Sequence, residues 1–129
     1  MKKVLIINAN YYKKICKRLS LSAKKILTRN NIQHKTINIP GVFEIPFTLK
    51  KFVKKFDAFV ILGCVIKGET PHFDLISRST FDAIIRISVD YNKPITNGII
   101  TCLNMRQAKA RKKKGAEAAE AVISVLSQK

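Results

Sequence analysis

The chain alternates short apolar segments with longer amphipathic ones, and this alternation constrains its fold more than any other feature. Apolar or alternating segments occupy residues 4–7, 34–39, 57–64 and 95–102. Segments whose apolar residues recur at helical spacing occupy residues 12–30, 44–56, 74–90 and 106–129. Strands that alternate with helices favour a parallel sheet covered on both faces. We therefore predict an α/β fold, a three-layer αβα sandwich around a four-stranded parallel sheet.

The same patterns predict finer details of the third and fourth strand–helix units. In the third helix, the residues expected on the inner face are Leu75, Ile76, Ile84 and Ile87. The dipeptide Asn97-Gly98 is expected to interrupt the fourth strand. The basic cluster at residues 111–114 and Gly115 are expected to interrupt the final helix.

Length and composition limit the classes of protein to which this chain can belong. With 129 residues it fits one domain, residues 1–129, with a real core. No run approaches the roughly 18 apolar residues of a membrane span. The first apolar run has only about four residues, against the roughly 7–15 of a secretion signal. We expect a cytoplasmic protein with no membrane partner.

Three cysteines, Cys16, Cys64 and Cys102, lie within apolar patterns and lack the spacing of metal ligands. They predict buried thiols in a reducing compartment, and no metal site.

The formal net charge of +17 raises the question of nucleic-acid binding. However, the lysines are spread over every segment, and only residues 111–114 form a dense cluster. This distribution is typical of solvated surfaces, so we expect no specific nucleic-acid partner.

The segment 67–74 combines a glycine, a cation, hydroxyl and carboxyl side chains and a histidine, all of which can bind or react with a ligand. It follows a buried strand and precedes a helix, so it lies at the carboxyl edge of the sheet, where open α/β sheets bind ligands. Gly68 and the helix start can form an anion site, Thr70 offers a hydroxyl donor, and His72 can exchange protons near neutral pH. The same residues also fit an ordinary loop with a solvated histidine.

Two other strand-to-helix loops meet the same edge of the sheet. Residues 40–44 contain Phe43 and Glu44, and residues 8–12 contain Tyr11, an aromatic able to stack on a planar ring. Taken singly, a helix-start carboxylate is often a cap and an aromatic often belongs to the core. Together, the three loops predict one pocket with an aromatic, a carboxylate, an anion site and a histidine.

Three motifs resemble those of lumazine synthases. Residues 41–46 read Gly-Val-Phe-Glu-Ile-Pro, residues 62–74 match the central signature of that family almost throughout, and residues 114–119 read Lys-Gly-Ala-Glu-Ala-Ala. The resemblance extends from Val4 over essentially the whole chain. It implies a flavodoxin-like fold.

The resemblance also implies a reaction. The family condenses 5-amino-6-(D-ribitylamino)uracil with 3,4-dihydroxy-2-butanone 4-phosphate to 6,7-dimethyl-8-ribityllumazine, releasing phosphate and water. This is the penultimate step of riboflavin biosynthesis, and it uses no cofactor and no metal. The alternative is a catalytically inactive flavin- or nucleic-acid-binding protein on the same scaffold.

Residue roles carried over from the family fall on matching positions. His72 corresponds to the proton-transfer residue. The substrate contacts implied by the resemblance are Tyr11, Val42, Phe43, Glu44, Cys64, Val65, Ile66, Glu69, Thr70, Asn97 and Arg111.

The chain departs from the family pattern at three places. Asn10 stands where an arginine usually precedes the stacking aromatic, and Asn97 stands where the family usually has an aromatic or aliphatic residue. The segment between Arg111 and Lys114 is shorter than usual. Arg111 is the expected phosphate ligand, with Arg106 as the weaker candidate.

The resemblance finally implies a shared site. In this family the fourth strand and the basic arm of one subunit face the loops of its neighbour, so Asn97 and Arg111 are expected to reach another subunit's His72. We therefore expect a homo-oligomer, most simply an isolated pentamer. A 60-subunit shell is the alternative, but we expect the short N-terminus and the repulsion between +17 subunits to disfavour it.

Overall fold

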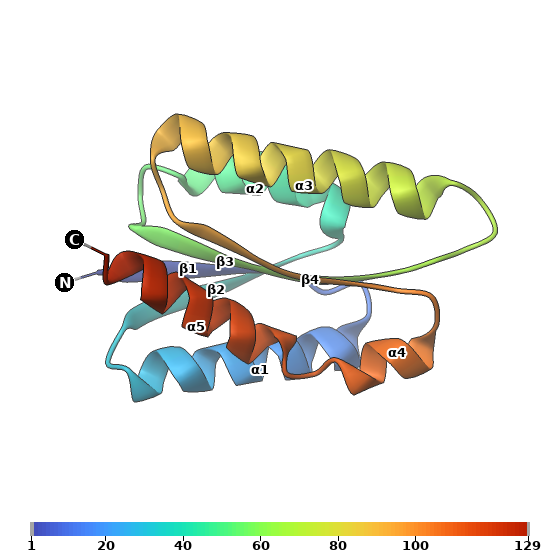
Figure 1. Ribbon diagram of the computed structural model, residues 1–129, viewed down its shortest axis with the longest axis horizontal. Helices are drawn as coiled ribbons and strands as arrows, with labels where there is room; N and C mark the ends of the chain where they lie inside the picture. Colours follow the sequence, from blue (N-terminus) through green and yellow to red (C-terminus); the bar gives the residue numbers. More distant parts are fainter. Residues whose placement is uncertain (1, 129) are drawn as a thin grey trace.

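A computed structural model describes residues 2–128, and its sheet has the predicted parallel topology. Four strands lie in the order β2-β1-β3-β4, with every neighbouring pair parallel (Figure 1). The strands are β1 (Lys3–Ala9), β2 (Gln33–Ile39), β3 (Ala58–Ile66) and β4 (Ile95–Cys102). The helices are α1 (Lys13–Arg29), α2 (Ile45–Phe52), α3 (His72–Tyr91), α4 (Met105–Ala110) and α5 (Lys114–Leu126), with a 3₁₀ turn η1 (Val42–Glu44) before α2.

The helices cover both faces of the sheet, so the α/β, flavodoxin-like prediction is confirmed. Figure 1 shows α2 and α3 on one face and α1, α4 and α5 on the other. Alternate residues of β1 supply the two cores: Val4 and Ile6 pack with α1 and α5, whereas Leu5 and Ile7 pack with α2 and α3. The run at residues 4–7 of β1 is continuously apolar because the strand is buried on both faces, as is usual in parallel sheets.

The third strand-to-helix connection is shorter than the sequence suggested. β3 continues to Ile66, and α3 begins at His72, two residues before the predicted start. As a consequence, His72 is the first residue of a 20-residue helix and is held by regular backbone structure.

Strand β4 runs without interruption through Asn97 and Gly98, so the predicted break there is wrong. Gly98 is needed for packing. A Cβ at this position would lie 2.6 Å from Leu62 Cδ2 and 3.0 Å from the Ile61 carbonyl oxygen.

The predicted role of Gly115 is also wrong, because it lies inside α5. The helical segment is interrupted at residues 111–113, between α4 and α5, so the predicted interruption at the basic cluster is confirmed. A Cβ on Gly115 would overlap the Leu19 carbonyl oxygen, so the missing side chain lets α5 approach α1 closely.

On α3, the prediction for Leu75 is wrong while that for Ile84 is confirmed. Ile84 is 3% exposed and packs on the sheet, whereas Leu75 is 64% exposed. Leu75 shares the outward face of α3 with two other exposed apolar residues, Ile85 and Val89. None of the residues that the structure describes covers this face.

The three cysteines are free and buried, as predicted. Among the helices of residues 2–128, none has the length and apolar character needed to cross a bilayer.

Candidate active site

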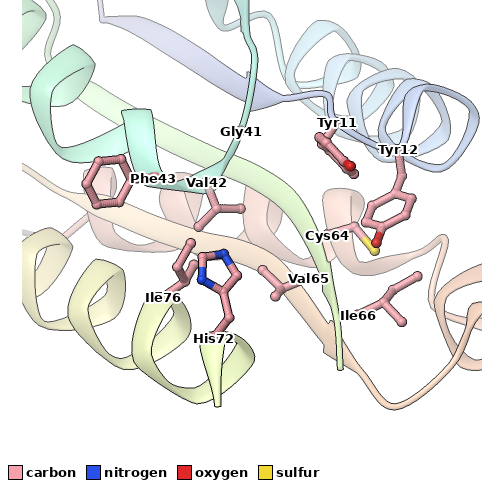
Figure 2. A pocket seen from close by; sticks show the side chains of 10 residues that line it. All are labelled: Tyr11, Tyr12, Gly41, Val42, Phe43, Cys64, Val65, Ile66, His72 and Ile76. Atoms are coloured by element: carbon pink, nitrogen blue, oxygen red, sulfur yellow. The ribbon is translucent and has the colours of Figure 1, made fainter. Parts of the chain in front are cut away.

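A cavity of about 350 Å³ lies at the carboxyl edge of the sheet, where the three predicted loops meet. The loops after β1 and β2, the end of β3 and the start of α3 contribute to it (Figure 2). Its lining consists of Tyr11, Tyr12, Gly41, Val42, Phe43, Cys64, Val65, Ile66, His72 and Ile76.

His72 is the ionisable group best placed for proton transfer in this cavity. Figure 2 shows its imidazole ring pointing into the cavity, beside Val42, Val65 and Ile76. Its backbone N–H donates to Thr70 Oγ1 at 3.4 Å. The side chain is exposed, so the ring can exchange protons with solvent and with a ligand.

The rest of the β3–α3 loop stays outside the cavity lining. Glu69 and Thr70 are exposed, and a Cβ built on Gly68 would meet no atom within 4 Å. The base of the loop is anchored, because Lys67 N–H donates to the Cys102 carbonyl oxygen at 2.8 Å. Open space beside the first turn of a helix, where backbone amides lack intrahelical partners, is a feature of anion sites.

Two adjacent tyrosines form the aromatic wall. Tyr11 is 73% exposed, and its ring meets that of Tyr12 edge to face, with centroids 5.0 Å apart and planes at 80°. Figure 2 shows the Tyr12 hydroxyl beside Cys64. Burial raises the pKa of Tyr12, with smaller contributions from Cys64 and Tyr11. Tyr12 therefore stays neutral and holds the ring of Tyr11 from the side.

Cys64 closes the floor of the cavity as an uncharged thiol. Burial raises its pKa to about 12, and Cys102 and Cys16 add to the shift. A thiol with so high a pKa is a poor nucleophile, since the thiolate is the reactive form. Cys64 acts as an apolar wall, as do Val65 and Ile66.

Phe43 and Glu44 lie in the turn that follows β2. Phe43 lines the cavity and is 73% exposed. Glu44 is not part of the lining, but a Cβ on the lining residue Gly41 would be 3.2 Å from Glu44 Oε1. The carboxylate therefore lies next to the cavity wall, close to the start of α2.

Asn97 and Arg111 lie away from the cavity of their own chain. Asn97 pairs with Ile61 in the sheet, whereas the lining residue Val65 pairs with Thr101, four residues further along β4. The Oδ1 of Asn97 accepts a hydrogen bond from the Ile99 N–H at 3.0 Å. Arg111 Nη1 donates to the Thr101 carbonyl oxygen at 2.9 Å and lies 3.8 Å from Cys102 Sγ.

The structure thus brings one group of the predicted residues together. Those that line the cavity are Tyr11, Val42, Phe43, Cys64, Val65, Ile66 and His72. Those that do not are Glu44, Glu69, Thr70, Asn97 and Arg111. Sequence reasoning missed Tyr12, Gly41 and Ile76, although Tyr12 and Gly41 lie in loops it had already placed at this edge.

The cavity has apolar and aromatic walls and one imidazole, and the start of a helix lies beside it. This fold, with a cavity at the carboxyl edge of a parallel sheet, is that of the α/β class of enzymes, whose members bind small molecules at this edge.

Comparison with known proteins gives the particular family. The family model described as 6,7-dimethyl-8-ribityllumazine synthase matches residues 1–129. The protein of that name from a Polaromonas species is 34% identical over 128 residues, covering 95% of this chain and 83% of the relative. The Campylobacter jejuni protein is 37% identical over 131 residues, covering 96% and 85%. The Polynucleobacter necessarius protein is 45% identical over 96 residues, covering 72% and 56%.

The chain belongs to the 6,7-dimethyl-8-ribityllumazine synthase family. Its function is therefore that of a transferase in riboflavin biosynthesis.

Proposed function

We propose that the cavity at the carboxyl edge is where the ribitylaminouracil and the phosphorylated butanone condense, with His72 as the proton-transfer group. The observation that carries the proposal is the direction of the His72 imidazole, which points into a cavity with apolar and aromatic walls. The heterocycle lies against Tyr11, Cys64, Val65 and Ile66.

The chemistry needs few groups from the protein. The uracil 5-amine attacks the ketone and forms a Schiff base with loss of one water. Phosphate is then eliminated to leave an enol, which tautomerises to a second ketone. The ribitylamino nitrogen closes the ring on that ketone with loss of a second water. Each stage moves protons between nitrogen, oxygen and carbon, which His72 can relay. Holding the two reactants side by side in the cavity supplies much of the remaining acceleration.

Anion binding completes the site. The exposed loop residues Glu69 and Thr70 and the first turn of α3 form one side of the phosphate site. Glu44, beside the wall at Gly41, accepts hydrogen bonds from the ribityl hydroxyls, and Val42 and Phe43 contact the same portion of the substrate.

We further propose that a neighbouring subunit supplies the missing part of the site, so that the active form is a homo-oligomer and most simply a pentamer. Asn97 and Arg111 do not line the cavity of their own chain, which leaves them free to contact a neighbour's cavity. The apolar residues that remain exposed on η1, α2 and α3 are Phe43, Phe47, Leu75, Ile85 and Val89. Such a surface favours association.

Arg111 is the proposed phosphate ligand from that neighbour. Arg111 directly follows α4, and its guanidinium donates to the carbonyl oxygen of Thr101, near the carboxyl end of β4. Arg106 is the second candidate, because it is exposed near the start of α4.

The cytoplasm is the proposed site of action, since three free buried thiols suit a reducing compartment.

Incubating the purified protein with both substrates and following the fluorescence of the lumazine product tests the assignment. Product formation that requires both substrates, with release of one phosphate per turnover, is the expected result. Tight flavin binding without turnover would instead identify a catalytically inactive binding protein.

A further inference from the structure

A second cavity, of about 340 Å³, lies between helix α1 and the edge strand β2, on the face of the sheet away from α2 and α3. No residue lines both this cavity and the one at the carboxyl edge. Its lining is almost entirely polar: amides and hydroxyls from β1, β2 and α1, three lysines from α1, and no carboxylate.

Among residues 2–128, two buried oxygens of this floor have no hydrogen-bond partner. Asn8 is 3% exposed, and its amide is oriented by two bonds, from Nδ2 to the Cys16 carbonyl oxygen at 3.3 Å and to Asn38 Oδ1 at 3.1 Å. This orientation leaves Asn8 Oδ1 without a partner in the part of the chain that the structure describes, and the same holds for the buried Thr36 Oγ1. Buried polar atoms are almost always hydrogen-bonded in folded proteins, so this floor favours a ligand that supplies donors.

The wall facing this floor is strongly basic. Lys13, Lys17 and Lys24 follow one another along one face of α1, at spacings of four and seven residues. Helix α1 contains no acidic residue. Like charges four residues apart on a helix repel each other, and an anion between them removes that repulsion.

We propose that this cavity binds a small phosphorylated polyol, such as a sugar phosphate. The phosphate group lies among the ammonium groups of the three lysines. Hydroxyl groups of the same molecule displace the side chains that cover the floor and donate to Asn8 Oδ1 and Thr36 Oγ1. The volume lies within the range of about 300–1,000 Å³ that small-molecule sites occupy. No aromatic residue lines the cavity, which disfavours a nucleotide.

Ribose 5-phosphate and inorganic phosphate are the probes for this site, with affinity measured by calorimetry at an ionic strength of about 0.15 M to screen diffuse attraction. The test variant is Lys17→Gln/Lys24→Gln. The matched control is Lys51→Gln/Lys54→Gln, which removes the same charge from the opposite face of the sheet. Arg111→Ala, measured in parallel, separates this site from the proposed substrate phosphate site.

We expect saturable binding of ribose 5-phosphate that weakens about tenfold or more in Lys17→Gln/Lys24→Gln, as loss of charge-assisted contacts requires. In the control variant and in Arg111→Ala, the affinity for ribose 5-phosphate should stay within about twofold of that of the native chain. Thr36→Val should weaken the binding of ribose 5-phosphate but leave the affinity for inorganic phosphate unchanged.

Three results would overturn the proposal. Equal weakening in the test and control variants would show general electrostatic attraction. Loss of binding in Arg111→Ala alone would place all phosphate binding at the substrate cavity. An unchanged affinity for ribose 5-phosphate in Thr36→Val would show that the hydroxyl groups of the polyol do not bind to the floor.

Discussion

At the scale of single residues, His72 carries the most specific chemical assignment. Replacing it with alanine removes the imidazole that points into the cavity and leaves the other lining residues in place. We expect kcat to fall about 100-fold, at the low end of the usual 10²–10⁴-fold cost of a lost proton-transfer group, because proximity still acts. Steady-state fluorescence of the product measures this. An unchanged rate would exclude His72 from the mechanism.

Arg111 is expected to act on binding more than on chemistry. In Arg111→Ala, KM for the phosphate-bearing substrate should rise, since a charge-assisted contact contributes roughly 1.5–3 kcal/mol, while KM for the pyrimidine stays nearly constant. Arg106→Ala is the matched control. If Arg106→Ala gives the larger effect, the phosphate ligand lies on the first turn of α4 and Arg111 only ties the chain to Thr101.

Tyr12 is a positioning residue found only in the structure. Its ring supports that of Tyr11, and such edge-to-face pairs contribute about 0.5–1.5 kcal/mol beyond burial. Tyr12→Ala should therefore raise KM for the pyrimidine substrate about 2- to 10-fold, and Tyr12→Phe should restore it. A failure of phenylalanine to restore KM would show that the hydroxyl, and not the ring, is what matters.

At the scale of the elements, the contact between α1 and α5 depends on one absent side chain. A methyl group at Gly115 would overlap the Leu19 carbonyl oxygen and lie 2.6 Å from Ser22 Oγ. Gly115→Ala should lower the free energy of unfolding by about 1–3 kcal/mol, the usual cost of overpacking. Denaturant titration measures it, with Gly68→Ala as control because a Cβ there meets nothing within 4 Å. Equal stability in both variants would mean that α5 moves away freely.

At the scale of the whole molecule, the proposed shared site makes activity depend on assembly into an oligomer. Introducing a charge into the outward face of α3, as in Ile85→Glu, should break the proposed oligomer, because a carboxylate buried at an apolar interface is strongly unfavourable. Light scattering after size exclusion should show a pentamer for the native chain and smaller, inactive species for the variant. The matched control is Lys51→Glu on the exposed side of α2. An active monomer would overturn the shared site, and a mass near sixty subunits would show a shell.

Much of the fold and part of the site followed from local pattern. Strand and helix positions depend on the spacing of apolar residues within about ten positions, and His72 lies in a long motif next to a strand end. The wrong predictions concern residues whose burial depends on packing between elements. Leu75 fits an apolar stripe by local spacing, yet α3 turns it outward, because the packing of α3 on the sheet selects Ile84 and its neighbours.

The sequence by itself therefore determined the order of elements, the parallel sheet, the edge that carries the site and the family. These properties reside in short-range periodicity and in contiguous motifs. The tertiary structure alone decided that Tyr12 and Ile76 join the cavity, that Gly115 packs on Leu19, and that Asn8 and Thr36 form the floor of a second cavity. Each of these depends on contacts between elements distant in the chain, whose approach is set by strand register and helix packing and leaves no local pattern.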